Sequence, residues 1–189
     1  IATALLIVSH NSLSLVFFAL AVVFIFILSP SKKFAGVALL ALAAGLALSA
    51  FYWVPALFER GYTYGDLFMK DLYKDHFPPL VNFFIPNFTN DVRLRTSEIS
   101  VQLGLFHTIG VFLSLYLLWH KKISKGITKK LLIASLLLTA GTFFFMQPAS
   151  RFFWQNVKLL RQFQFPWRLL AVTTFTTSIL SLSFFHLPF

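Results

Sequence analysis

Residues 1–28, IATALLIVSHNSLSLVFFALAVVFIFIL, contain no charged side chain. An α-helix rises about 1.5 Å per residue and the hydrocarbon core of a bilayer is about 30 Å thick, so about 20 such residues can cross it. A lipid-exposed strand would have to close into a barrel and alternate apolar with polar residues, which this segment does not do. The segment therefore predicts a membrane-spanning helix over residues 7–28.

Four further segments have the same apolar character, at residues 34–54, 99–119, 129–147 and 168–187. The segment 129–147 reaches spanning length only if Lys129 and Lys130 extend their ammonium groups to the interface. We therefore expect an all-α fold: a polytopic transmembrane helix bundle with about five spans, one long outer loop and one interfacial amphipathic helix.

Composition supports a membrane protein. The 189 residues are 58% hydrophobic and only 12% charged, whereas soluble domains have about 25% charged residues. The absence of cysteine excludes a disulfide scaffold, thiolate zinc sites and cysteine nucleophiles. The net charge of +10 does not indicate a nucleic-acid partner, because the basic residues lie in gaps between apolar runs. The expected partner is instead the lipid bilayer.

The charges of the connecting loops predict the orientation. Loops 29–33 and 120–130 contain no acid and seven lysines, namely Lys32, Lys33, Lys121, Lys122, Lys125, Lys129 and Lys130. By the positive-inside rule both loops are cytoplasmic. The other two connections contain all six acids and are expected to lie outside, which gives a multi-pass protein of the cell (inner) membrane.

The chain is expected to be an internal piece, residues 1–189, of a larger transmembrane domain. It begins at Ile1 without a basic region before the first apolar run, and it ends directly after an apolar segment. The remainder of its own chain is then a partner.

Two patterns concern packing. Small residues recur four positions apart in three predicted spans, where they favour close helix contact, with a polar substrate path as the less favoured alternative: Ala41, Gly45, Ser49; Ser100, Gly104, Thr108; and Thr173, Thr177, Ser181. In residues 150–163 polar and apolar side chains fall on opposite helical faces, which predicts one amphipathic helix lying in the membrane interface.

Several polar residues at membrane depth are candidates for function. His10 and Asn11 are expected near the outer end of the first span, where they either hydrogen-bond to a neighbouring helix or contact a substrate or headgroup. His107 is deeper, and it is either a neutral histidine bonded to a neighbouring helix or a catalytic or proton-relay group. Gln102 lies nearer the outer end of the same predicted span.

The outer acids give weaker signals. Asp71, Asp75 and His76 have a spacing that a divalent cation accepts, but the alternation with Lys70 and Lys74 favours an ordinary solvated helix. Glu59 is either a general base or a charged residue that anchors the end of the predicted second span. We assign no metal site, and a divalent cation stays a hypothesis for the unknown cofactor.

Three motifs carry a family resemblance: Ser9-His10-Asn11, the run FYWVPAL at residues 51–57 followed by Glu59, and QFPWRL at residues 164–169. They resemble a group of large microbial multi-pass proteins labelled 6-pyruvoyl-tetrahydropterin synthase-related membrane proteins, which are similar in layout to the GT-C glycosyltransferases. The label does not describe the chemistry, because the soluble synthase uses a reactive cysteine and this chain has none.

The resemblance implies transfer of a sugar from a polyprenyl-phosphate donor on the outer face. In that superfamily the catalytic acid usually lies in an early outer loop, which here would be upstream of Ile1. Glu59, Asp66, Asp71 and Asp75 are therefore weak catalytic candidates, and the catalytic residues are unknown.

Arg168 with Arg161 is the candidate binding site for the lipid phosphate. Pro166 suits the first turn of a helix, whose free N–H groups and positive dipole end favour an anion, and the planar arginine fork matches phosphate. The equally weighted alternative is that Trp167 and Arg168 are ordinary interfacial anchors. Two other functions stay open: a transporter or lipid flippase, and a non-catalytic membrane assembly subunit.

Overall fold

The computed structural model describes residues 1–63, 71–85, 101–123, 126–161 and 163–186, and these residues are helical without any β-strand. The chain divides into two compact units, Ile1–Asp71 and Leu72–Phe189, which are described separately. The all-α prediction is thus confirmed for the described residues.

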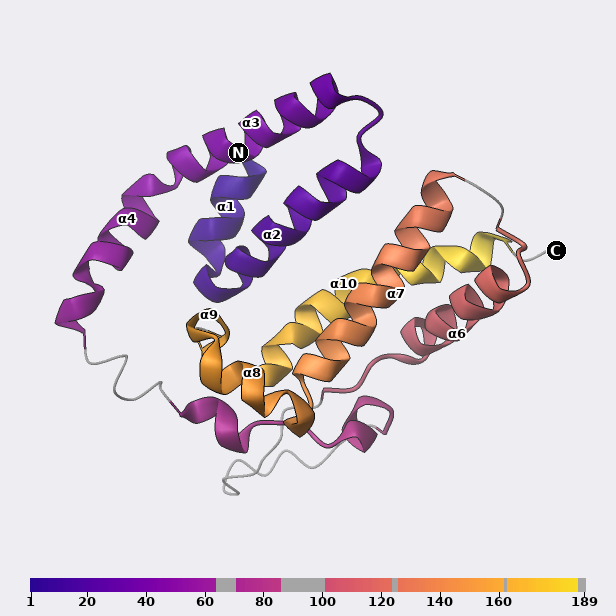
Figure 1. Ribbon diagram of the computed structural model, residues 1–189. Helices are drawn as coiled ribbons and strands as arrows, with labels where there is room; N and C mark the ends of the chain where they lie inside the picture. Colours follow the sequence, from indigo (N-terminus) through magenta and orange to yellow (C-terminus); the bar gives the residue numbers. More distant parts are fainter. Residues whose placement is uncertain (64–70, 86–100, 124–125, 162, 187–189) are drawn as a thin grey trace. The chain divides into compact units, whose positions relative to one another are not determined.

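The first unit contains α1 (Ala2–Ser9), α2 (Asn11–Leu28), α3 (Lys32–Leu48), α4 (Ala50–Phe58) and the 3₁₀ turn η1 (Glu59–Tyr62), with α1, α2 and α3 packed on one another (Figure 1). The prediction of one helix running through residues 7–28 is wrong, because the chain turns at His10. His10 has extended backbone angles, φ −155° and ψ 98°, and its Nδ1 accepts a hydrogen bond from the Leu13 N–H at 3.3 Å. The imidazole therefore caps α2, which begins at Asn11.

Close approach of α1 and α3 depends on a glycine. A Cβ placed on Gly45 would lie 2.5 Å from Thr3 Cβ, so no larger residue fits without movement. Of the small residues expected to pack here, Gly45 and Ser49 are buried, whereas Ala41 is exposed. The second predicted span is also not one straight helix, since the chain bends by 64° between α3 and α4.

The second unit is built on three longer helices, α6 (Leu105–Trp119), α7 (Ile127–Phe145) and α10 (Leu170–Leu180) (Figure 1). Helix α10 packs along α7 and against α6, and η6 also contacts α6. The shorter elements are η2 (Leu72–Asp75), η3 (Leu80–Phe83), η4 (Pro148–Ser150), α8 (Arg151–Asn156), α9 (Lys158–Arg161), η5 (Pro166–Leu169) and η6 (Ser181–His186).

The third predicted span starts later than expected. Helix α6 begins at Leu105 rather than at residue 99, because the Leu103 N–H donates to the Phe83 carbonyl at 2.8 Å and the side chains of Val101 and Leu103 are buried ahead of the helix. Its packing residue is Gly110, where a Cβ would lie 2.8 Å from Ser181 Oγ and 3.0 Å from Ser181 Cα. The predicted stripe through Gly104 and Thr108 is therefore displaced along the helix, while Ser100 lies outside the described residues.

The predicted amphipathic helix over residues 150–163 is two short helices. The chain breaks at Val157, with φ −98° and ψ 102°, so α8 ends at Asn156 and α9 starts at Lys158. The buried side chain of α8 is Trp154, which docks on Tyr73 and Phe77. The packing of this indole on Tyr73 and Phe77, rather than a continuous apolar face, holds α8 in place.

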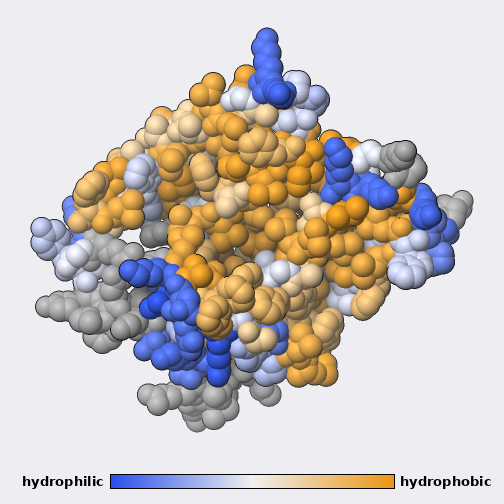
Figure 2. Space-filling model, in the orientation of Figure 1, coloured by the Kyte–Doolittle hydropathy of each residue, from blue (hydrophilic) through white to orange (hydrophobic). Residues whose placement is uncertain are grey.

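Within the described residues, two helical stretches are long and apolar enough to cross a membrane, α7 and the continuous run Pro166–His186, with a third if α3 and α4 are counted as one bent span. Both α7 and Pro166–His186 correspond within about two residues to predicted spans. Apolar side chains cover much of the helices in Figure 2, with hydrophilic side chains gathered in separate clusters.

Candidate functional site: the arginine end of the second unit

Three arginines lie in the segment that joins α7 to α10: Arg151 in α8, Arg161 in α9 and Arg168 in η5. We call these three residues, with the aromatic rings that contact them, the arginine end. A guanidinium has five N–H donors, so one hydrogen bond to the protein leaves capacity for a ligand.

Arg168 is held by its own loop. Its Nη1 donates to the Phe163 carbonyl at 3.1 Å, and the guanidinium carbon lies 5.0 Å from the centre of the Phe165 ring. Phe165 in turn stacks on Trp167, with 5.4 Å between ring centres, and meets the edge of His76 at 4.7 Å. The hydrogen bond and the ring contact therefore fix the orientation of the Arg168 guanidinium without a ligand.

The loop reverses at Gln164, whose φ of +62° lies in the left-handed region that non-glycine residues seldom adopt. The Phe165 N–H then donates to the Phe163 carbonyl at 2.6 Å, and buried Pro166 opens η5 as the sequence predicts. This turn presents the Phe163 carbonyl to Arg168.

Arg151 binds an aromatic cluster. Its guanidinium lies 5.6 Å from the centre of Phe77, and its Nη2 donates to the Lys74 carbonyl at 3.4 Å. Behind it, Tyr73 stacks on Trp154 at 5.7 Å, and the Trp154 Nε1–H donates to the Phe145 carbonyl at 2.9 Å. The cluster thus ties α8 to the last turn of α7.

Arg161 makes a different contact. Its Nη2 donates to the Gln155 carbonyl at 2.6 Å, and its buried Nε has no hydrogen-bond partner among the described residues. No described contact joins Arg161 to Arg168. The two arginines expected to act together are therefore each bonded to a separate backbone carbonyl.

His107 bonds to a neighbouring helix, which is one of the two roles expected for it. Its Nδ1 lies 2.9 Å from Thr177 Oγ1 of α10. The Thr177 hydroxyl also contacts the Thr173 carbonyl at 2.7 Å, where only the hydroxyl can donate. Nδ1 is then the donor to Thr177, which makes His107 part of the α6–α10 contact.

A row of buried hydroxyls lies along α7 and α10, and the sequence pattern predicted those of α10 but not those of α7. Thr139 Oγ1 lies 2.7 Å from Thr176 Oγ1, and Thr142 Oγ1 lies 2.9 Å from Thr173 Oγ1. The signal was present as threonines three positions apart in the fourth predicted span. Buried Ser135 lies one turn before Thr139, and its Oγ has no partner among the described residues.

The other polar residues proposed from the sequence do not form a common site in the described part of the chain. Gln102 is exposed and precedes α6, so it is not part of that helix. His10 serves as a helix cap, and the side chain of Asn11 is outside the described structure, as is Asp66.

The acids form no common site in the described part of the chain. Glu59, Asp71 and Asp75 are exposed, and no group of three or more histidine or acidic side chains lies close enough to hold a metal ion among the residues described. Asp75 ends a 3₁₀ turn that begins only at Leu72, so Asp71 and Asp75 do not share an α-helical face. His76 Nδ1 lies 2.6 Å from the Leu72 carbonyl.

Comparison of the chain with protein-family models, with curated proteins and with solved structures found no match.

Proposed function

We propose that the chain is part of an integral membrane protein resembling a GT-C glycosyltransferase, and that its arginine end binds the phosphate of a polyprenyl-phosphate-linked sugar. The observation that carries the proposal is the orientation of Arg168 between the Phe163 carbonyl and the Phe165 ring. A guanidinium that is already ordered loses little side-chain freedom when it binds an anion, and its planar fork matches phosphate oxygens.

The second unit also offers a lipid-linked ligand a suitable setting. Arg168 belongs to the first turn of the apolar run Pro166–His186, so a phosphate bound there would have its hydrocarbon chain beside an apolar helix. The contacts described for Arg151, Arg161 and Arg168 are to backbone carbonyls and aromatic rings.

The proposal includes five crossings, with loops 29–33 and 120–130 in the cytoplasm. Helix α2 has 18 residues, and α6 has 15 preceded by four non-helical ones. Non-helical backbone is tolerated at membrane depth where protein buries it, and Val101 and Leu103 are buried here. Labelling of a Lys122→Cys variant by an impermeant thiol reagent in intact cells would contradict this topology, whereas labelling of Lys158→Cys is expected.

A transporter or flippase receives less support. It would need a polar path across the bilayer, but the hydroxyls of Thr173, Thr176 and Thr177 are occupied by partners on α6 and α7. The arrangement therefore supports helix packing for this row.

Binding of polyprenyl phosphate to the purified protein in detergent tests the proposal, with the polyprenol of equal length as the comparison ligand. We expect preference for the phosphate, and at least about a ten-fold loss in Arg168→Lys, since a hydrogen bond to a charged group contributes about 1.5–3 kcal/mol. Lys130→Ala, which removes an exposed charge at the other end of α7, is the matched control.

Equal binding of the phosphate and the alcohol, or unchanged binding by Arg168→Lys, would leave Arg168 as an interfacial anchor and reject the site. Phosphate binding without sugar transfer by the full-length protein would instead point to the non-catalytic assembly subunit.

A further inference from the structure

We propose that α4 lies along the membrane surface, in the headgroup interface at the end of α3, and that Trp53 locks it in this position. The inference rests on the proposed membrane location, and it replaces the straight second span expected from the sequence. Its partner is the phospholipid interface itself.

Lengths support this arrangement. Helix α3 has 17 residues and α4 has nine, so a straight helix of both would be about 39 Å long, more than the hydrocarbon core of about 30 Å. With the observed bend of 64°, α4 adds only about 6 Å along the α3 axis, and the pair extends about 31 Å. The bend therefore matches the apolar segment to the bilayer.

The bend is fixed by side chains that take over backbone hydrogen bonds. Ser49 is fully buried, and its Oγ donates to the carbonyls of Gly45 at 3.1 Å and Leu46 at 3.0 Å. The Trp53 Nε1–H also donates to the Leu46 carbonyl, at 2.9 Å. The Leu46 carbonyl thus has two side-chain donors, and the indole stabilises the bend by joining α4 to the last turn of α3.

The surface of α4 suits the interface. The helix has no buried residue in its unit, and Phe51 and Phe58 are 74% and 81% exposed. Tyr62 in η1 is 88% exposed and follows Glu59, so the apolar surface ends at polar residues. Trp and Tyr are enriched at this depth in membrane proteins.

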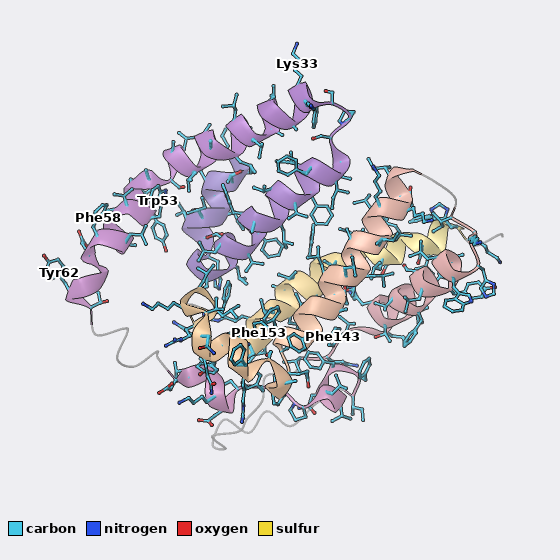
Figure 3. The ribbon with its side chains drawn as sticks, viewed as in Figure 1. Lys33, Trp53, Phe58, Tyr62, Phe143 and Phe153 are labelled. Carbon is cyan, nitrogen blue, oxygen red and sulfur yellow. The ribbon has the colours of Figure 1, made fainter. Side chains whose placement is uncertain are left out.

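The charges at the two ends of the pair agree with this placement. Figure 3 shows Lys33 at one end of α3 and Trp53, Phe58 and Tyr62 along the α4 end. A lysine pair at one end and an aromatic helix at the other correspond to the two interfaces of a bilayer.

Nitroxide labels test the orientation in the full chain, reconstituted in dioleoylphosphatidylcholine vesicles. The chain has no cysteine, so single variants Phe51→Cys and Phe58→Cys can be compared with Val37→Cys and Leu48→Cys on α3. Depth is measured from the ratio of oxygen to nickel-chelate relaxation. We expect the α4 labels to differ in depth by about 5 Å and the α3 labels by about 16 Å.

A depth difference of about 10 Å between the α4 labels would mean a continuous span and overturn the inference. Labels on α4 in bulk water, with α3 labels in lipid, would also overturn it while leaving the membrane proposal intact. If the α3 labels are in water too, both proposals fail.

The role of Trp53 is tested by the distance distribution between labels in Val37→Cys/Phe58→Cys. We expect Trp53→Phe, which keeps an aromatic ring but loses the donor, to broaden the distribution, whereas Phe51→Leu should not. An unchanged distribution in Trp53→Phe would refute the lock.

Discussion

The described contact of α1 with α3 in the first unit is a close approach at a glycine, whereas α7 and α10 in the second unit bond to each other through hydroxyls. At Gly45 the absence of a side chain lets α3 approach Thr3 of α1. Between α7 and α10, by contrast, Thr139 pairs with Thr176 and Thr142 with Thr173. In the first unit the Ser49 hydroxyl instead donates to backbone carbonyls of its own helix.

The difference teaches that small and hydroxylated residues four positions apart indicate a packing face but do not specify its chemistry. A hydroxyl can bond either to the preceding turn or to a neighbouring helix, and the partner's sequence decides between them. Four substitutions separate close approach from hydrogen bonding.

Gly110→Ala is expected to have the largest effect, a loss of about 2–3 kcal/mol in the free energy of unfolding. Its Cβ would lie 3.0 Å from Ser181 Cα, a backbone atom that cannot rotate away. Titration of the protein with SDS in mixed micelles, followed by circular dichroism, measures the loss. Gly141→Ala in α7, with open space around it, is the control and should not destabilise.

Gly45→Ala should cost less, about 1–2 kcal/mol in the same titration. The obstructing atom is Thr3 Cβ of α1, a helix of eight residues that can shift more easily than Ser181, which continues directly from α10. Gly36→Ala in α3 has no neighbour within 4 Å and should slightly stabilise the helix. A loss at Gly45 equal to that at Gly110 would show that both units are equally rigid.

Thr142→Val should cost about 0.6–1.7 kcal/mol, the range measured for hydrogen bonds between membrane helices. The change removes the contact with Thr173 while preserving side-chain shape. Ser178→Ala, whose exposed hydroxyl bonds only to the Thr174 carbonyl of its own helix, is the control. In a double-mutant cycle with Thr173→Val, zero coupling energy would contradict the proposed interhelical bond.

Ser135→Ala should have the smallest effect, neutral or slightly stabilising. Its buried Oγ has no partner among the described residues, so alanine removes a desolvated polar group without breaking a bond. A clear loss of stability in the same titration would mean that the hydroxyl binds a water or another group, which would extend the hydroxyl row by one turn.

Much of the fold follows from local pattern. Long apolar runs predicted α7 and Pro166–His186 within about two residues, and Pro166 marked the start of η5. The segments that differ are those in which one side chain forms a contact that periodicity does not encode. His10 caps α2, and Trp154 docks on Tyr73 with a break three residues later.

The candidate site shows the same division. The sequence by itself determined that Arg161 and Arg168 lie at the start of an apolar helix, because residue type and order are sufficient for that. Only the tertiary structure decided that Arg168 lies over Phe165 and bonds to Phe163, and that Arg161 bonds to Gln155. Apolar length and charge act locally along the chain, whereas the partner of a hydrogen bond depends on which segments the fold brings within about 3 Å.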